Sequence, residues 1–287
     1  MNIVIKNKFT FILLCNLFFL SCSGENKNVD KEVKVEAQVE NTFNSDDYDF
    51  VLPQPISLAK AFQASGLSYH PNLTHDVSKK DKYFDKVKQL LNLGVYSTDL
   101  AYSAINEHAN EARAYLKAIQ LLGNQVGLKP VFSDKDLIDR FDKSLNNMES
   151  VEELIYEIQE RSEEYMQDND LRYLSIVQFS GAWSEGMYLG IKDIELSKEK
   201  NEKMSVTVVD QMNLLKNIIK GLSTYPNSDT VLKNVNKKLN QILTEYNEFE
   251  SVKKSTSNDV FVSPVLTDSE LKKLSLMIYE LRTFIIQ

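Results

Sequence analysis

The sequence predicts an all-α protein, a multi-helix antiparallel bundle of about eight helices that follows a disordered N-terminal tether. Two observations support this fold class. Only 9 glycines and 6 prolines occur among the 287 residues, too few for a turn-rich β-protein. Apolar residues also recur at steps of three and four over long stretches, which is the spacing of one face of a helix.

Three C-terminal segments, at about 202–222, 230–250 and 269–286, show this spacing most clearly. The apolar positions of the middle segment are Leu232, Val235, Leu239, Ile242, Tyr246 and Phe249. A period close to 3.5 residues predicts helices that pack at shallow angles. The short connections between these segments predict antiparallel neighbours, and the lack of a fixed repeat length makes a solenoid the less favoured arrangement.

The remaining helices are expected before these three. Glycines followed by loop residues predict two of their ends, Gly94 for the second helix and Gly127 for the third. Capping boxes predict three starts along the chain, at Ser133 with Asp136, Ser150 with Glu153, and Thr267 with Glu270. The expected ranges are 56–64, 78–93, 98–126, 134–145, 151–167 and 171–194.

The N-terminus has the pattern of an export signal. Lys6 and Lys8 precede an apolar run at 9–20, which is too short to cross a bilayer as a stable anchor. The run ends at Ser21-Cys22, which resembles the lipobox of bacterial lipoproteins. That resemblance implies cleavage before Cys22 and attachment of acyl chains such as palmitate to this residue. The alternative is an ordinary secretory signal in which Cys22 is incidental.

The expected organisation is therefore a lipoprotein signal peptide at 1–21, a flexible tether at 22–50 that carries the lipidated Cys22, and a single helical domain at 51–287. The tether is polar and acidic, so it should remain solvated. Ser23 after the cysteine, where no aspartate stands, resembles lipoproteins released to the outer membrane. We expect a lipid-anchored protein of the cell envelope, in the outer membrane, with its domain on either the periplasmic or the surface face.

Charge and motifs narrow the function. The formal net charge is −8, which disfavours nucleic acid as a partner and direct electrostatic binding to anionic lipid. No HExxH, GxSxG, P-loop or GxGxxG motif occurs. The three histidines, His70, His75 and His108, lack the spacing of a metal site. The sequence therefore predicts no enzyme, no cofactor and no metal.

The segment at 171–194 differs from the other predicted helices. Its apolar residues surround the whole circumference, which is typical of a helix in the middle of a fold. It contains Gly181, Gly186 and Gly190, each of which costs about 1 kcal/mol in a helix interior. Ala182, Gly186 and Gly190 form a row of small side chains, so we expect another backbone to approach closely there.

Glu185 lies inside this helix. If it is buried, its carboxylate must be paired, hydrogen-bonded or held neutral by a raised pKa. Three interpretations follow: a structural buried network, a ligand site with Trp183 and Glu185 in its wall, or a side chain that reaches solvent. The partners that the sequence suggests are Arg113, Arg140 and Arg172.

Three short motifs resemble a group of exported helical lipoproteins of Bacteroidota. They are GVYSTDLAY at 94–102, LIDRF at 137–141 and GAWSEGMY at 181–188. The resemblance implies a helical fold and an envelope location, and it brings no activity with it. It also singles out five positions as a candidate ligand or partner site, namely Asp99, Tyr102, Arg140, Trp183 and Glu185.

Three hypotheses of function follow. The first is a non-catalytic binding or scaffold lipoprotein, anchored through Cys22, with a protein partner in the envelope. The second is a small-ligand-binding domain with its site near Trp183 and Glu185. The third and least favoured is an envelope hydrolase, which would need a cleft that holds two acids.

Overall fold

The computed structural model describes residues 52–134, 136–144, 147–197, 201–224, 229–256 and 263–287. The chain divides into two units, Met1–Thr42 and Phe43–Gln287, and all described residues belong to the second. The predicted signal peptide, Cys22 and the tether lie outside the described residues. The domain boundaries drawn from the sequence therefore stay predictions.

The described residues form α-helices and one short 3-10 helix, with no strand among them, so the predicted all-α class is confirmed. None of these helices is both long and apolar enough to cross a membrane. The elements are α1 (Pro55–Ala64), η2 (Val77–Lys82), α2 (Lys86–Ile105), α3 (Ala109–Val126), α4 (Leu137–Ser144), α5 (Met148–Asp168), α6 (Arg172–Leu196), α7 (Glu202–Met212), α8 (Leu215–Ser223), α9 (Thr230–Asn247), α10 (Glu250–Thr256) and α11 (Asp268–Ile286).

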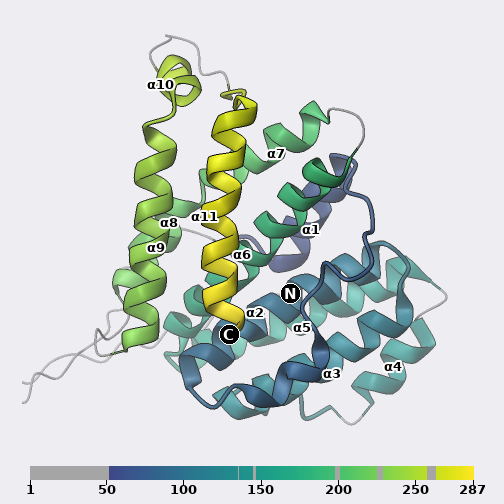
Figure 1. The fold of residues 1–287 in the computed structure, drawn as a ribbon. Helices are drawn as coiled ribbons and strands as arrows, with labels where there is room; N and C mark the ends of the chain where they lie inside the picture. The colour runs from purple at the N-terminus through teal and green to yellow at the C-terminus, as the bar shows by residue number, and fades with distance from the viewer. Residues whose placement is uncertain (1–51, 135, 145–146, 198–200, 225–228, 257–262) are drawn as a thin grey trace, which may run out of the picture. The chain divides into compact units, whose positions relative to one another are not determined.

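Helix α6 is the central element, as its apolar circumference predicts. It packs most extensively on α2 and also contacts α1, α5, α7, α8 and α11. On one side of it α9 and α11 run antiparallel next to each other, and α2, α3, α4 and α5 lie on the other side (Figure 1). Trp183 is the largest of the fully buried side chains. The hydrophobic core therefore surrounds α6.

Gly94 does not end a helix, which corrects the sequence prediction. Helix α2 continues through it to Ile105, and the break falls instead at Glu107, whose φ of 63° is left-handed. A Cβ at Gly94 would overlap the backbone carbonyl of Gln178, and one at Gly181 would overlap that of Leu91. The two glycines allow α2 and α6 to cross with their backbones in contact.

The predicted row of small residues has the expected role only at its start. A Cβ at Gly94 would also overlap the backbone nitrogen of Ala182, so the close backbone approach includes the first residue of the row. Gly186 faces the side chain of Leu58, and Gly190 faces the ring of Phe62, both on α1. Side chains of α1, rather than another backbone, therefore pack against these two glycines.

The predicted helix ends fall into two groups. Gly127 ends α3 with a left-handed φ of 104°, and Thr267 with Glu270 forms the predicted capping box of α11. Other residues take the place of the two remaining predicted capping boxes. Asn147 caps α5 in place of Ser150, and before α4 the Asp134 carboxylate, rather than Ser133, accepts from the Asp136 N–H. The single helix predicted at 202–222 is divided at Asn213–Leu214 into α7 and α8.

Candidate functional site: a pocket beside α6

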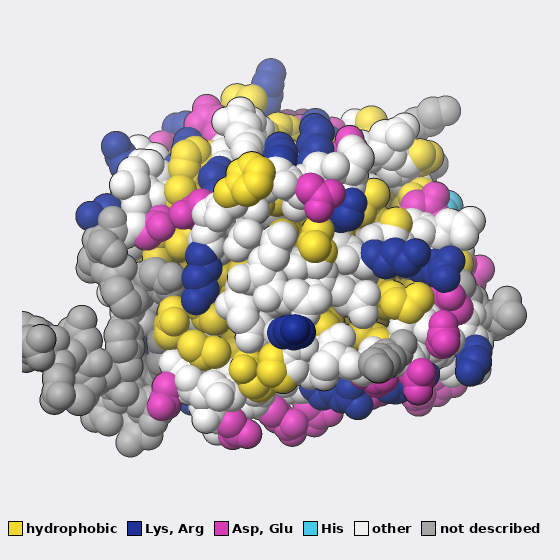
Figure 2. Space-filling model, turned by 90° about the horizontal axis from the view of Figure 1, so that it is seen from below, with side chains coloured by type: hydrophobic (Ala, Val, Ile, Leu, Met, Phe, Trp, Pro, Cys, Tyr) yellow, Lys and Arg dark blue, Asp and Glu magenta, His cyan; other side chains and the backbone are white. Residues whose placement is uncertain are grey.

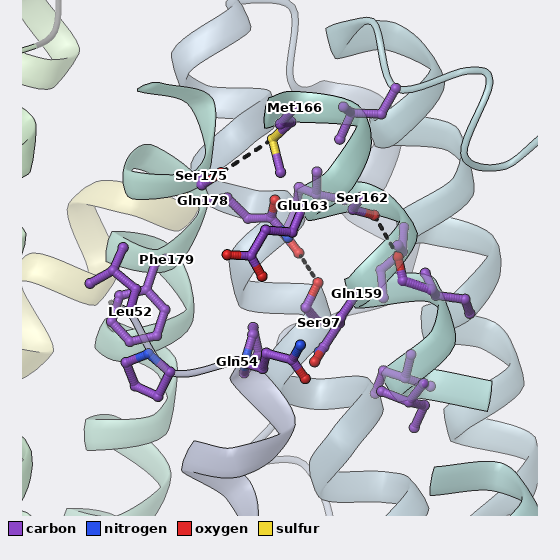
Figure 3. Close-up of a pocket in the computed structure, with 18 of the residues that line it drawn as sticks. Leu52, Gln54, Ser97, Gln159, Ser162, Glu163, Met166, Ser175, Gln178 and Phe179 are labelled. Carbon is purple, nitrogen blue, oxygen red and sulfur yellow. Dashed lines mark hydrogen bonds between the residues drawn. The ribbon is translucent and has the colours of Figure 1, made fainter. Parts of the chain in front are cut away.

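A cavity of about 90 Å³ lies where α2, α5 and the first half of α6 meet the segment that leads into α1. Figure 3 shows side chains from these elements facing one another around it. Most of its wall is apolar and buried. The apolar lining residues are Leu52, Pro53, Pro55, Leu93, Leu100, Ile119, Leu128, Phe132, Ile155, Ile158, Met166 and Phe179.

Seven polar side chains also line the cavity. Helical spacing brings Gln159, Ser162 and Glu163 of α5 to the same side, and the same spacing brings Ser175 and Gln178 of α6 together. Gln54 and Ser97 complete the set. A mainly apolar pocket with a few converging polar groups is the usual form of a small-molecule site.

The hydroxyl groups of this pocket already have acceptors for their protons. Ser97 donates to the Leu93 carbonyl and Ser162 to the Ile158 carbonyl, each at 2.7 Å. Ser175 donates to the Met166 sulfur at 3.4 Å. These bonds, some of which are drawn in Figure 3, leave the oxygen lone pairs as the groups that the serines offer to the cavity.

Gln159 contributes an acceptor that has no donor. Its Oε1 atom is buried and forms no hydrogen bond with any described residue. A buried polar atom without a partner costs roughly 1–3 kcal/mol. Such atoms are uncommon in folded proteins and call for an explanation, and here the atom belongs to a pocket-lining side chain.

Two of the sequence-predicted residues, Asp99 and Glu185, come together in a buried cluster elsewhere along α6. Arg282 of α11 binds Glu185 through two hydrogen bonds of 2.7 Å, from Nε to Oε2 and from a terminal nitrogen to Oε1. The side chains of Arg282 and Glu185 are only 11% and 0% exposed. The guanidinium also lies 3.8 Å from the ring centroid of Tyr188. A planar guanidinium suits such bidentate, stacked pairing.

Burial raises the pKa of Asp99 well above its ordinary value, and the charge of Glu185 raises it further. Arg282 and the His75 N–H, which donates to Oδ2 at 3.0 Å, act in the opposite direction. The other oxygen, Oδ1, has no donor among the described residues. Asp99 therefore adds a second acid beside the Glu185–Arg282 pair, with one of its oxygens unpaired within the described part of the chain.

Residues around this cluster attach the loop at 67–76 to the helices. Tyr102 donates to the Ser68 carbonyl at 2.9 Å and accepts from the His70 N–H at 2.7 Å. His70 Nε2 lies 2.8 Å from a carboxylate oxygen of Asp193. These contacts fix the loop, so Tyr102 stabilises the fold instead of lining the pocket.

His75 is held neutral within the same cluster. Its Nε2 lies 2.6 Å from the Tyr83 hydroxyl, and its ring stacks on Tyr96. Burial lowers the pKa of His75 to about 3, with a further contribution from Arg282. No group of three or more possible metal ligands occurs among the described residues.

The remaining predicted residues lie elsewhere. The Trp183 indole donates to the Gln211 carbonyl at 3.0 Å, so this side chain fixes the end of α7. Arg140 is a surface residue of α4, 40% exposed, and it binds Glu157 and Asp134. None of the five sequence-predicted residues is among those that line the pocket.

The arginine partner expected for Glu185 was also wrong. Arg113 pairs with Asp142, Arg140 with Glu157, and Arg172 with Gln167. The actual partner, Arg282, lies four residues after Ile278 and beside Leu281, on the buried face of α11. A charged residue on an otherwise apolar helix face was the signal in the sequence.

Comparisons with protein-family models, with curated proteins and with solved structures found no match to this chain.

Proposed function

We propose that the helical domain is a non-catalytic module that binds a small, mainly apolar molecule in the pocket between α2, α5 and α6. The observation that carries this proposal is the pocket itself, with the buried Oε1 of Gln159 unsatisfied in its wall. Protein interiors are normally close-packed and their buried polar atoms paired. A ligand would fill the space, and a rotation of the Gln159 side chain would let it donate to Oε1.

The chemistry of the lining favours binding over catalysis. No histidine, lysine or cysteine is among the described residues that line the cavity, and the one acid, Glu163, is exposed. The buried part of the described lining therefore holds no ordinary general base or activated nucleophile. The serine hydroxyls donate to neighbouring acceptors and are not activated by a base. Asp99 and Glu185 are two neighbouring acids, as a hydrolase would need, but both are buried and neither lines the pocket.

The expected protein partner is the second candidate, and it stays a prediction. Phe84, at the junction of η2 and α2, is 89% exposed and could contribute to such a contact. A broad apolar patch would favour a protein interface. On the face shown in Figure 2, hydrophobic side chains form several small groups that charged and polar side chains separate. The pocket is therefore the stronger basis for a function.

Filling the pocket tests the proposed function. We expect Ser97→Leu, or Ser162→Leu as an independent variant, to place a larger apolar side chain in the cavity. Ser205→Leu is the matched control, because Ser205 also donates to a carbonyl four residues earlier but lies on α7, away from the pocket. Ligand-observed NMR with a library of small apolar fragments should detect binding to wild type and control and none to the filled variants. Equal binding by all four proteins would refute the proposal.

We further propose that this module is held in the cell envelope by acyl chains on Cys22. The charged start, the short apolar run and the Ser21-Cys22 junction support this placement, and several acyl chains on one residue give firm anchoring. Labelling cells with a palmitate analogue should mark the wild-type chain in the membrane fraction. Cys22→Ser should lose the label and leave that fraction, and a labelled Cys22→Ser chain would disprove the anchor.

A further inference from the structure

The serine hydroxyls of the pocket are hydrogen-bond acceptors towards a ligand, because each already donates its proton to a neighbouring residue. Gln159 adds a buried Oε1 atom without a donor among the described residues. A ligand that pairs with these oxygens must itself donate hydrogen bonds, whereas the amide groups of Gln54, Gln159 and Gln178 can both donate and accept.

The charge of the lining also favours a ligand that donates hydrogen bonds. No lysine, arginine or histidine is among the described lining residues, and Glu163 is the one acid. Glu163 is exposed, which places its carboxylate at the mouth of the cavity, and it forms no ion pair with a described residue. Glu163 follows Gln159 by four residues on α5, so both side chains face the same side of the helix.

The interior of the pocket is narrow and apolar. Its volume of about 90 Å³ is smaller than the roughly 150 Å³ cavity that holds a benzene ring. Buried residues such as Leu93, Ile158 and Phe179 form its wall. This space admits part of a slender alkyl chain but not a broad ring system, and it leaves the polar end of the ligand at the mouth.

We propose that the pocket binds a primary amine with a short alkyl tail, an inference that rests on the proposed function. The ammonium group lies at the mouth, where its N–H groups donate to the Glu163 carboxylate and to oxygens of the neighbouring polar side chains. The tail enters the apolar space. A carboxylate or phosphate ligand would instead meet the negative charge of Glu163 and find no cation in the lining.

Three ligands of equal length test the class of head group: hexylamine, hexanoate and hexanol, each titrated against the full chain by isothermal calorimetry at neutral pH. We expect hexylamine to bind about tenfold more tightly than hexanoate, from the reversed charge interaction at the mouth. In Glu163→Gln its affinity should fall about fivefold, the size of an exposed ion pair. Glu164→Gln is the control, since this exposed neighbour does not line the pocket.

Equal binding of the amine and the carboxylate, or an unchanged hexylamine affinity in Glu163→Gln, would overturn the proposal. Tighter binding of hexanol or hexanoate would reject the amine while the pocket remains a ligand site. Failure of the proposed function gives a different result. In that case the affinity of each of the three ligands is the same for wild type and for Ser97→Leu.

Discussion

Replacing Arg282 by methionine removes the cation that pairs with Glu185 and keeps much of the side-chain volume. The change leaves Glu185, which is 0% exposed, with no arginine beside it, while Asp99 is close by. Removing one partner of a buried ion pair destabilises proteins by roughly 3–5 kcal/mol. Because small domains have roughly 5–15 kcal/mol of stability in total, we expect Arg282→Met to be close to unfolding at neutral pH.

The pH dependence of this loss follows from Asp99. Arg282 lowers the pKa of Asp99, so without Arg282 the folded-state pKa of this carboxyl rises further above its unfolded value. A carboxyl with a raised pKa in the folded state gains protons on folding, so its unfavourable contribution grows as the pH rises above the unfolded value. The difference in unfolding free energy between Arg282→Met and wild type should therefore be larger at pH 7.5 than at pH 5.

Urea unfolding followed by circular dichroism measures these free energies at the two pH values. Arg172→Met is the matched control, because Arg172 bonds at an exposed site to Gln167, its one hydrogen-bond partner among the residues that the structure describes. Adding Glu185→Gln to Arg282→Met should recover part of the loss, since the unpaired charge is then removed. A loss below about 1 kcal/mol in Arg282→Met, the range of a surface pair, would refute the buried-pair interpretation.

Three further predictions concern other parts of the fold. His75 is neutral when folded, because its pKa is lowered to about 3. The unfolding free energy of wild type should therefore fall as the pH falls from 6.5 towards 3, by about 2 kcal/mol at pH 5. In His75→Gln this pH dependence should be missing. Gly94→Ala should lower the unfolding free energy by at least about 2 kcal/mol, because the new methyl group meets backbone. Gly186→Ala should cost less, because its methyl group meets the end of the Leu58 side chain. Equal melting temperatures of the two variants would contradict the close crossing of α2 and α6. Arg140→Ala should cost only about 0.5–1 kcal/mol in a urea titration, because its ion pairs are at the surface, and a larger loss would show that the pairs are not screened by solvent.

The sequence predicted the parts of the fold that depend on local pattern. The spacing of Leu232, Val235, Leu239 and Ile242 predicted the buried face of α9, and Thr267 with Glu270 predicted the start of α11. Gly94 was misread because a glycine that ends a helix and a glycine that lets two helices touch have the same local appearance. Only the position of α6 distinguishes them.

The candidate site could be predicted only in part. Glu185 stood out as a charge within an apolar helix, and the structure shows it buried with Asp99 close by. The pocket gave little signal, because its lining comes from segments between Leu52 and Phe179 that are far apart in the chain. A cavity is a property of how side chains fail to fill space, which no single segment encodes.

The proposed function requires that a small molecule occupies the pocket beside α6. Native mass spectrometry of the full chain, purified in parallel as wild type and Ser97→Leu from the cells that make it, tests this most directly. We expect wild type to carry an added small mass that Ser97→Leu lacks. If the amine inference holds, the compound released from wild type should react with an amine-specific reagent. A bare wild-type chain, or the same added mass on Ser97→Leu, would contradict the account.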